Sequence, residues 1–337
     1  MASHVHTSGF DWARTMRSRS DMASHVPTNS FRSRPENAAT PFPAFRRFGL
    51  MASWEDIANE IAPTGAESGS LATGARRGSH GEKGNLGSVF NVSRYLEPAP
   101  VAKTDSADSV WGGREESATS GTYYFVDRGV TNYDPQAEAL NSRLENALKD
   151  PPSRWLEGLD ASDLLFCDIE TTGLSASNPL FLIGTMRWIQ HEPRLQLYLA
   201  RDLDEEKSVL EAFAKVVRGK TLVTFNGKSF DWPFIEGRAR RHRVSLPEPA
   251  GHYDLLFSAR RRYRSELPNC KLQTLEMGVC GRGRKGDIPS SQIPERYHDF
   301  LDLHRTGAGA YLLAPVLFHN ALDVLTMAEL ICCMAEK

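Results

Sequence analysis

A net charge of −2 over 337 residues, 24% of them charged and 40% hydrophobic, suits a globular protein of one or two domains and excludes a generally basic nucleic-acid-binding chain. No apolar stretch approaches the roughly 20 residues that a membrane-spanning helix needs, and the N-terminus lacks the apolar core of a signal peptide. We therefore expect a cytoplasmic protein with no membrane partner. The five cysteines are odd in number and show no Cys-x-x-Cys spacing, which favours reduced thiols over disulfides or a zinc site.

Residues 1–121 differ in composition from the rest of the chain. Ser, Gly, Pro, Asn and Arg dominate, apolar residues stand singly, and neither a helical nor a strand period is sustained. This composition predicts a long disordered tail and linker. Within it, residues 51–62 place Trp54, Ile57 and Ile61 on one side of a short helix, which reads equally as a docking element or as a transient helix in a tail.

From residue 122 to residue 337 the pattern predicts one folded domain. Strands are expected over residues 123–126 (at an edge), 163–168, 180–189, 195–200 and 221–225. Helices are expected over residues 137–148 and 204–218, from Trp232 onward, and over residues 315–334. A meander of strands followed by strands that alternate with helices predicts an α/β fold with a mixed five-stranded sheet flanked by helices. In such sheets, ligands gather at the carboxyl ends of the strands.

The first group of candidate functional residues lies at the end of the strand over residues 163–168. If the strand continues, its period of two places Asp168 and Glu170 on the same face. At about 4 Å and an effective dielectric near 20, two such charges repel by roughly 4 kcal/mol, a cost that a bound cation would remove. Taken alone, the pair also fits one acid that caps the next element and one that faces solvent.

Two further acidic positions follow. Asp231 comes directly after the strand over residues 221–225, which we expect to lie beside the first acidic strand. His319 and Asp323 lie four residues apart, and so on one face, in a helix that is otherwise apolar nearly all round. Polar groups in a buried helix need partners, so the pair alone also fits a hydrogen-bonded core feature.

Together these three stretches resemble the motifs of the DEDD superfamily of 3′-to-5′ exonucleases, which have a ribonuclease H-like fold. The matching segments are Asp168-Ile169-Glu170-Thr171-Thr172-Gly173-Leu174, Asn226-x-x-x-Phe230-Asp231 and His319-Asn320-Ala321-Leu322-Asp323. The YprB-like branch is similar in a further segment, residues 252–256, and the resemblance runs from about residue 123 to the C-terminus. His319 lies four residues before Asp323, the spacing of the family's tyrosine subclass, whereas its histidine subclass uses five.

The resemblance implies an enzyme that hydrolyses phosphodiester bonds at the single-stranded 3′ ends of DNA or RNA. Two divalent cations, Mg²⁺ or Mn²⁺, would be held by four acids, Asp168, Glu170, Asp231 and Asp323. His319 would be the general base, since an imidazole titrates near neutrality. The residues implied in substrate binding are Thr171, Thr172, Leu174, Asn226 and Phe230.

Other residues fit more than one role. Asp254 follows a short apolar stretch and reads as a helix N-cap or as an additional carboxylate behind the metal ligands. Arginines in three stretches, 238–243, 260–264 and 282–285, would form a local basic face for backbone phosphates, although a charge run is usually a solvated helix face. The alternatives to an exonuclease are a non-cleaving nucleic-acid-binding or scaffolding module and a structure-selective endonuclease, each on the same fold.

Overall fold

The structure, a computed structural model, describes residues 90–98, 107–304 and 308–336. The helix predicted over residues 51–62 lies outside these residues. The strands are β1 (Arg94–Leu96), β2 (Arg114–Ser117), β3 (Thr122–Gly129), β4 (Leu164–Thr171), β5 (Leu180–Ile189), β6 (Glu192–Leu199), β7 (Thr221–Thr224), β8 (Gly251–Asp254) and β9 (Arg282–Arg284). The helices are α2 (Leu140–Lys149), α3 (Glu206–Val217), α4 (Asp231–His242), α5 (Leu255–Tyr263), α6 (Leu272–Gly278), α7 (Ile293–His304) and α8 (Ala310–Ala335).

The main sheet has the strand order β2-β3-β6-β5-β4-β7-β8. β4, β7 and β8 are parallel to one another, and the other neighbours are antiparallel. This arrangement confirms the predicted α/β fold with a mixed, helix-flanked sheet and the predicted pairing of the two strands that precede the acidic motifs. The sheet has seven strands, however, and not the five expected.

The two additional strands carry weak sequence signals. β2 reads Arg-Glu-Glu-Ser and exposes most of its side chains, so it shows no alternation of apolar residues. It pairs with β3 across a tight turn and displaces β3 from the edge position that we expected. β1 and β2 also extend the ordered part of the chain beyond the boundary expected at residue 122. β8 has only four residues and follows a loop rich in proline.

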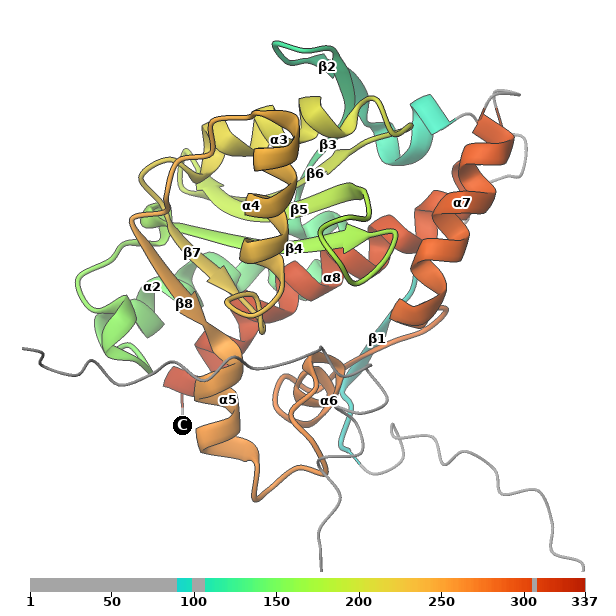
Figure 1. Cartoon of the computed structure of the whole chain (residues 1–337). Helices are drawn as coiled ribbons and strands as arrows, with labels where there is room; N and C mark the ends of the chain where they lie inside the picture. Colours follow the sequence, from blue (N-terminus) through green and yellow to red (C-terminus); the bar gives the residue numbers. More distant parts are fainter. Residues whose placement is uncertain (1–89, 99–106, 305–307, 337) are drawn as a thin grey trace, which may run out of the picture. The chain divides into compact units, whose positions relative to one another are not determined.

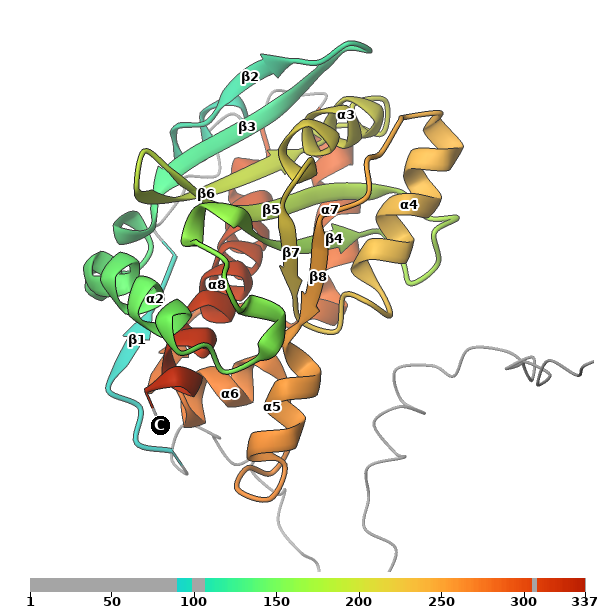
Figure 2. The same cartoon turned by 90° about the vertical axis from the view of Figure 1, so that its left-hand side faces the viewer.

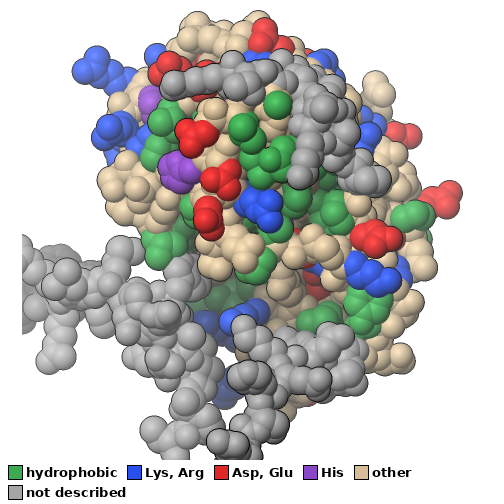
Figure 3. All heavy atoms as spheres, turned by 90° about the vertical axis from the view of Figure 1, so that its right-hand side faces the viewer, with side chains coloured by type: hydrophobic (Ala, Val, Ile, Leu, Met, Phe, Trp, Pro, Cys, Tyr) green, Lys and Arg blue, Asp and Glu red, His purple; other side chains and the backbone are tan. Residues whose placement is uncertain are grey.

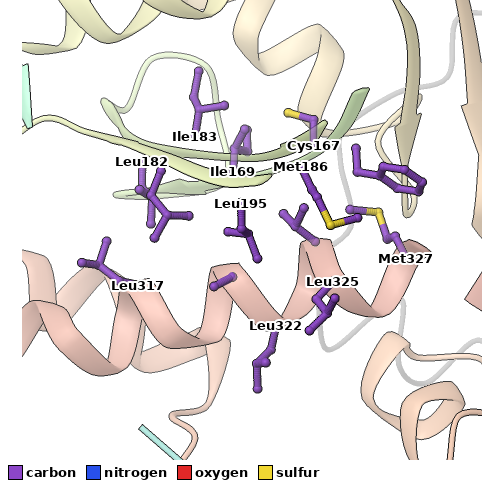
Figure 4. Close-up of a cluster of buried hydrophobic side chains, with 14 of the residues drawn as sticks. Cys167, Ile169, Leu182, Ile183, Met186, Leu195, Leu317, Leu322, Leu325 and Met327 are labelled. Carbon is purple, nitrogen blue, oxygen red and sulfur yellow. The ribbon is translucent and has the colours of Figure 1, made fainter. Parts of the chain in front are cut away.

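Helices cover both faces of the sheet (Figures 1 and 2). α8 crosses one face, with α2 beside it, while α3 and α4 cover the other. The alternation along β5 decides which side chains meet α8: Leu182 and Met186 point toward the helix and Ile183 points away (Figure 4). Leu195 of β6 joins Leu182 and Met186 in this layer.

α8 is the central element of the fold. It has 26 residues, nearly all of them buried. Contrary to the expectation from the sequence, its length and composition alone would allow it to cross a membrane, but 89% of its most apolar 18-residue window is buried inside the protein. The core helix of a folded domain passes the same test, so this is weak evidence for a membrane span.

A small parallel pair, β1 with β9, lies outside the main sheet and is tied to α8 by buried charges. Arg94 on β1 contacts Asp134 Oδ2 at 2.7 Å and Glu329 Oε1 at 2.9 Å. Arg282 on β9 contacts the other oxygen of Glu329, also at 2.9 Å, and Glu276 Oε1 at 2.6 Å. The side chains of Asp134 and Arg282 are fully buried, so these ions compensate one another away from water.

We predict that Arg94→Ala destabilises the protein by about 3 kcal/mol, because it leaves buried carboxylates under-compensated. Chemical denaturation measures this change. The matched control is Arg143→Ala, which removes a surface pair with Glu336 whose side chains are 34% and 52% exposed. The control should cost no more than about 1 kcal/mol. Equal losses for the two variants would show that the buried network does not stabilise the fold.

Candidate active site

Asp168 and Glu170 lie on the face of β4 that α8 covers. In the β4–β5 register, Asp168 is opposite Gly184 and Glu170 is opposite Leu182. Because residues directly opposite in an antiparallel pair share a face, both carboxylates point to the same side as Leu182, toward α8. The predicted common face of the two acids is therefore observed.

Asn320 on α8 links the two acids. Its Nδ2 donates to Asp168 Oδ2 at 2.8 Å and to Glu170 Oε1 at 3.4 Å. Its Oδ1 lies directly over Gly184, where an added Cβ would be 1.7 Å away. Because residue 184 is a glycine, the side-chain amide of Asn320 has the space to reach Asp168 and Glu170 on the neighbouring strand.

Asp231 reaches the same strand from the other side. β7 pairs with β4 only as far as Phe166, so the edge of β4 beyond that residue is free of strand pairing. Asp231, the first residue of α4, lies beside this edge, where the backbone N–H of Ile169 partly offsets the rise in its pKa. The divergence of β4 and β7 therefore leaves room for the third acid beside the first two.

Asp254 holds the loop that leads to Asp231. Its Oδ1 accepts the N–H of Asn226 at 2.8 Å and of Leu256 at 3.1 Å, and its Oδ2 accepts the N–H of Lys228 at 3.1 Å. Asp254 is therefore the N-cap of α5 and also clamps the loop between β7 and α4. Asn226 takes a left-handed conformation, with φ of 66°, at the point where the loop turns.

His319 and Asp323 share a face of α8, as predicted. His319 Nε2 lies 3.4 Å from Asp323 Oδ2 and 3.3 Å from Ser290 Oγ. The opposite ring nitrogen, Nδ1, lies 2.8 Å from Asp287 Oδ1. An aspartate at Nδ1 orients the imidazole and leaves Nε2 facing the acidic group.

Asp323 is also paired with an arginine. Arg284 Nη2 lies 2.6 Å from Asp323 Oδ1, and its Nε lies 2.6 Å from Glu276 Oε2. Its Nη1 is 3.4 Å from Asp287 Oδ2, so one guanidinium connects the acid to the aspartate that orients His319.

Burial and mutual repulsion raise the pKa values of Asp168, Glu170 and Asp231. Desolvation, followed by the charges of Asp323, Asp231 and Glu170, raises the pKa of Asp168 well above its usual value. Desolvation likewise raises the pKa of Glu170 to about 8 and that of Asp231 to about 7. The charges of Asp323, Asp231 and Glu170 thus all act on Asp168.

Nearby negative charge outweighs the effect of burial on the pKa of His319. Desolvation alone would lower the pKa of His319, but the charge of Asp323, the hydrogen bond to Asp287 and the charge of Glu170 raise it to about 9. With these charges uncompensated, His319 is protonated at neutral pH and cannot accept a proton.

The remaining predicted substrate residues have mixed surroundings. The hydroxyls of Thr171 and Thr172 donate to backbone carbonyls within the loop that follows β4, at 2.8 and 3.3 Å, so they close a turn. Leu174 is 52% exposed at the tip of that loop. Phe230 packs against the core, with its ring centroid 5.5 Å from that of Phe234.

The predicted basic face is wrong for three of its arginines. Arg238, Arg282 and Arg284 are buried in ion pairs with acidic partners. On the side of the molecule shown in Figure 3, basic side chains are scattered among acidic and hydrophobic ones. The exposed members of the three stretches are Arg240, Arg241, Arg243, Arg260, Arg261, Arg264 and Lys285.

The donor set fits a hard divalent cation in its chemistry. Four carboxylates supply the oxygen ligands that Mg²⁺ and Mn²⁺ prefer, and the raised pKa values of Asp168, Glu170 and Asp231 indicate that these three lack compensating charge. As the side chains stand, no three His, Cys, Asp or Glu residues of the described segments are arranged closely enough to hold an ion. Asp323 in particular is engaged by Arg284 and His319, so ion binding requires it to turn from these partners.

Four residues were missed as parts of this site: Gly184, Arg284, Asp287 and Asn320. One available signal was the series of polar residues in the apolar α8, namely His319, Asn320, Asp323, Thr326 and Glu329. Their spacing of three or four residues forms a stripe that needs polar partners, and β9 supplies two of them. Nothing in the sequence distinguishes Gly184 from any other strand glycine.

Comparison with known proteins places this geometry in a family. Residues 165–335 match the model of the RNase H superfamily. The uncharacterized protein YprB of Bacillus subtilis (strain 168) is 34% identical over 185 residues, which are 54% of this chain and 44% of YprB.

Two DNA polymerases are similar at lower identity. The catalytic subunit of DNA polymerase epsilon from Eremothecium gossypii is 26% identical over 161 residues, 44% of this chain and 7% of the polymerase. The family B DNA polymerase of Pyrobaculum calidifontis matches with 16% identity and a TM-score of 0.33, over 50% of this chain and 27% of that one. The chain thus spans less than half the length of each relative.

We predict that Gly184→Ala disrupts the site, because the new methyl group must displace the Asn320 amide from Asp168 and Glu170. The expected loss of stability is about 2 kcal/mol, measured by chemical denaturation. Gly129→Ala in β3 is the matched control, since its Cβ would meet nothing closer than 3.7 Å. A Gly184→Ala protein as stable as this control would contradict the assigned contact.

We predict that the metal-free protein loses stability as the pH rises from about 5 to 8. Where a pKa is raised on folding, the folded state binds more protons than the unfolded state at any pH between the two pKa values. That pH window is 4.5 to about 8 for Glu170, 3.8 to about 7 for Asp231 and 6.5 to about 9 for His319. The free energy of unfolding therefore falls with pH across that window. Thermal unfolding in EDTA should show a lower Tm at pH 8 than at pH 6, by on the order of 5 °C.

Two further melts test the cause of that slope. Glu170→Gln removes one of the titrating acids and should flatten it. Mn²⁺ should raise the Tm more at pH 8 than at pH 6, because the cation competes with protons for the same oxygens. A Tm that rises with pH in EDTA would contradict the assigned electrostatics.

Proposed function

Because the chain belongs to the RNase H superfamily, we propose that it is a nuclease that hydrolyses phosphodiester bonds with the help of divalent cations. More specifically, we propose a 3′-to-5′ exonuclease that acts on single-stranded ends of DNA or RNA. One observation carries the proposal: four acids from distant parts of the chain act on one another in one buried region. The motif resemblance to the DEDD exonucleases supports the 3′-to-5′ direction.

Asp168, Glu170, Asp231 and Asp323 would hold two divalent cations. Cations bound there would lower the pKa of an attacking water and compensate the charge on the departing 3′ oxygen. The protein supplies the framework for this chemistry. Asn320 bridges Asp168 and Glu170.

His319 is the proposed general base. Asp287 keeps its Nδ1 bonded, so that Nε2 is the atom that takes up the proton. Because Asp323 and Glu170 raise its pKa to about 9, the imidazole becomes a usable base only when their charge is compensated. His319 would therefore accept a proton only when cations are bound to the acidic residues.

The loop that follows β4 is the proposed contact with the terminal nucleotide. The turn closed by Thr171 and Thr172 presents Leu174, an exposed apolar side chain, next to the acidic strand. An apolar side chain there suits packing against a terminal base, while the threonine hydroxyls hold the turn. Asn226 and Phe230 precede Asp231 in the loop after β7; Asn226 would contact the same end of the substrate, and Phe230, packed against the core, would support that loop.

A non-cleaving nucleic-acid-binding module is the second candidate, favoured by one observation. Arg284 supplies positive charge to Asp323 within the protein, at 2.6 Å, where the nuclease would need a cation ligand. If that pair persists in the presence of Mg²⁺ or Mn²⁺, the site lacks one of its four ligands. Oligonucleotides would then be bound but left intact.

We predict that the protein shortens end-labelled single-stranded oligonucleotides from the 3′ end in Mg²⁺ or Mn²⁺, giving ladders of single-nucleotide steps that EDTA abolishes. Asp168→Asn should lower the rate at least about a hundredfold and leave the fold intact by circular dichroism. Asp299→Asn, an exposed acid on α7, is the matched control and should keep full activity.

The products separate the candidates. Internal cuts would indicate an endonuclease, and retention of intact strands would favour the binding module. Asp168→Asn protein with undiminished activity would refute the assigned site.

A further inference from the structure

Trp155 is a large aromatic side chain exposed near the candidate site. It lies in the short 3₁₀ helix Arg154–Leu156 and is 55% exposed. Two cations lie over its ring: Lys228 Nζ at 5.1 Å and the Arg154 guanidinium at 5.9 Å from the centroid. Leaving most of an indole in water has a cost that packing into the core would avoid.

Lys228 connects this aromatic side chain to the acids. Its backbone N–H is clamped by Asp254, and it lies three residues before Asp231 in the loop between β7 and α4. Three residues of chain span at most about 11 Å, so the backbone of Lys228 lies no farther than that from the backbone of Asp231, and the Lys228 side chain extends from there to the ring. The lysine side chain is exposed and points to Trp155, toward the side of β8.

A cavity beside α5 lies close to Trp155 along the chain. It has a volume of about 310 Å³ and is lined by Pro152, Ser258, Arg261, Arg262 and Met334. Arg262 donates to the carbonyl of Met334 at 2.7 Å, whereas Arg261 is exposed and makes a long contact, 3.5 Å, with Ser258 Oγ. A guanidinium so placed can bind a phosphate.

We propose that Lys228, Trp155 and Arg261 form a subsite for single-stranded nucleic acid. One base stacks on the indole, and the flanking phosphates contact Lys228 and Arg261. The arrangement combines the two elements of a sequence-independent single-strand site, an aromatic platform and cations along the backbone path. Lys228 and Arg154 have flexible stems, so either can leave the ring for a phosphate when a base takes its face. The subsite rests on the proposed nuclease function and assigns the strand a direction, from the acids past β8 toward α5.

The test is binding of a short fluorescein-labelled oligothymidylate, followed by fluorescence anisotropy in Mg²⁺. Asp168→Asn protein serves as the background so that the probe stays intact. Adding Trp155→Ala should weaken binding about tenfold, Trp155→Phe should restore most of it, and Lys228→Ala should weaken binding and reduce its salt dependence. Lys215→Ala, an exposed lysine on α3, is the matched control and should bind like the background.

An abasic position moved along the probe identifies the stacked nucleotide. One position should weaken binding to the background protein and have no effect on the Trp155→Ala protein, because the base and the indole form one contact. In otherwise wild-type protein, Trp155→Ala should raise KM about tenfold and change kcat less than about twofold.

The outcomes distinguish this proposal from the one on which it rests. If the wild-type protein shortens oligonucleotides but Trp155→Ala changes neither Kd nor KM, the subsite is wrong and the nuclease function stands. If wild-type and background proteins neither cleave nor bind the probe, both proposals fail.

Discussion

The structure depends on compensating negative charge that is buried against α8. Asp168, Glu170, Asp231 and Asp323 raise the free energy of the folded state when they are ionised together, as the raised pKa values of the first three indicate. Within the described residues this charge is offset by an amide, a backbone N–H, an imidazole and a guanidinium, none of which neutralises all four acids. An enzyme site commonly keeps such a deficit, since a preorganised set of unneutralised acids is what a cation can bind.

The same constraint explains why β9 is rich in arginine although it is buried. Arg284 serves the acids at the site, and Arg282 serves Glu276 and Glu329 behind it. β1 then adds Arg94 to Glu329 and Asp134. Without this segment, which resembles a tail in composition, Asp134 and Glu329 would be left with the guanidinium of Arg282, which also pairs with Glu276.

Sequence reasoning recovered the elements whose burial leaves a pattern. The positions of the five expected strands along the chain, the shared face of Asp168 and Glu170, and the pairing of β4 with β7 follow from apolar runs and strand periodicity. β2 and β8 were not predicted, because they are strands through their pairing with β3 and β7 and not through an alternation of apolar residues. The arginines of β9 were assigned to the surface because a charged residue is expected to be exposed until its partners are known. The acidic partners of Arg282 lie 6 to 148 residues away in sequence. Contacts of that range are set by tertiary packing, which local pattern does not encode.

α8 shows why burial and function are joined in this fold. Its apolar residues secure the sheet through Leu182, Met186 and Leu195, while its polar stripe runs from His319 at one end to Glu329 at the other. A helix buried on nearly all sides cannot rotate or shift to relieve one contact without breaking the others. The position of His319 and Asn320 relative to β4 is therefore set by the packing of the whole helix, including the ion pairs that join α8 to β9 and β1. The positions of the side chains around the acids thus depend on helix contacts several turns away. Because the helix is held rigidly, any change of the site on binding must come from movement of side chains such as Asp323 and Arg284.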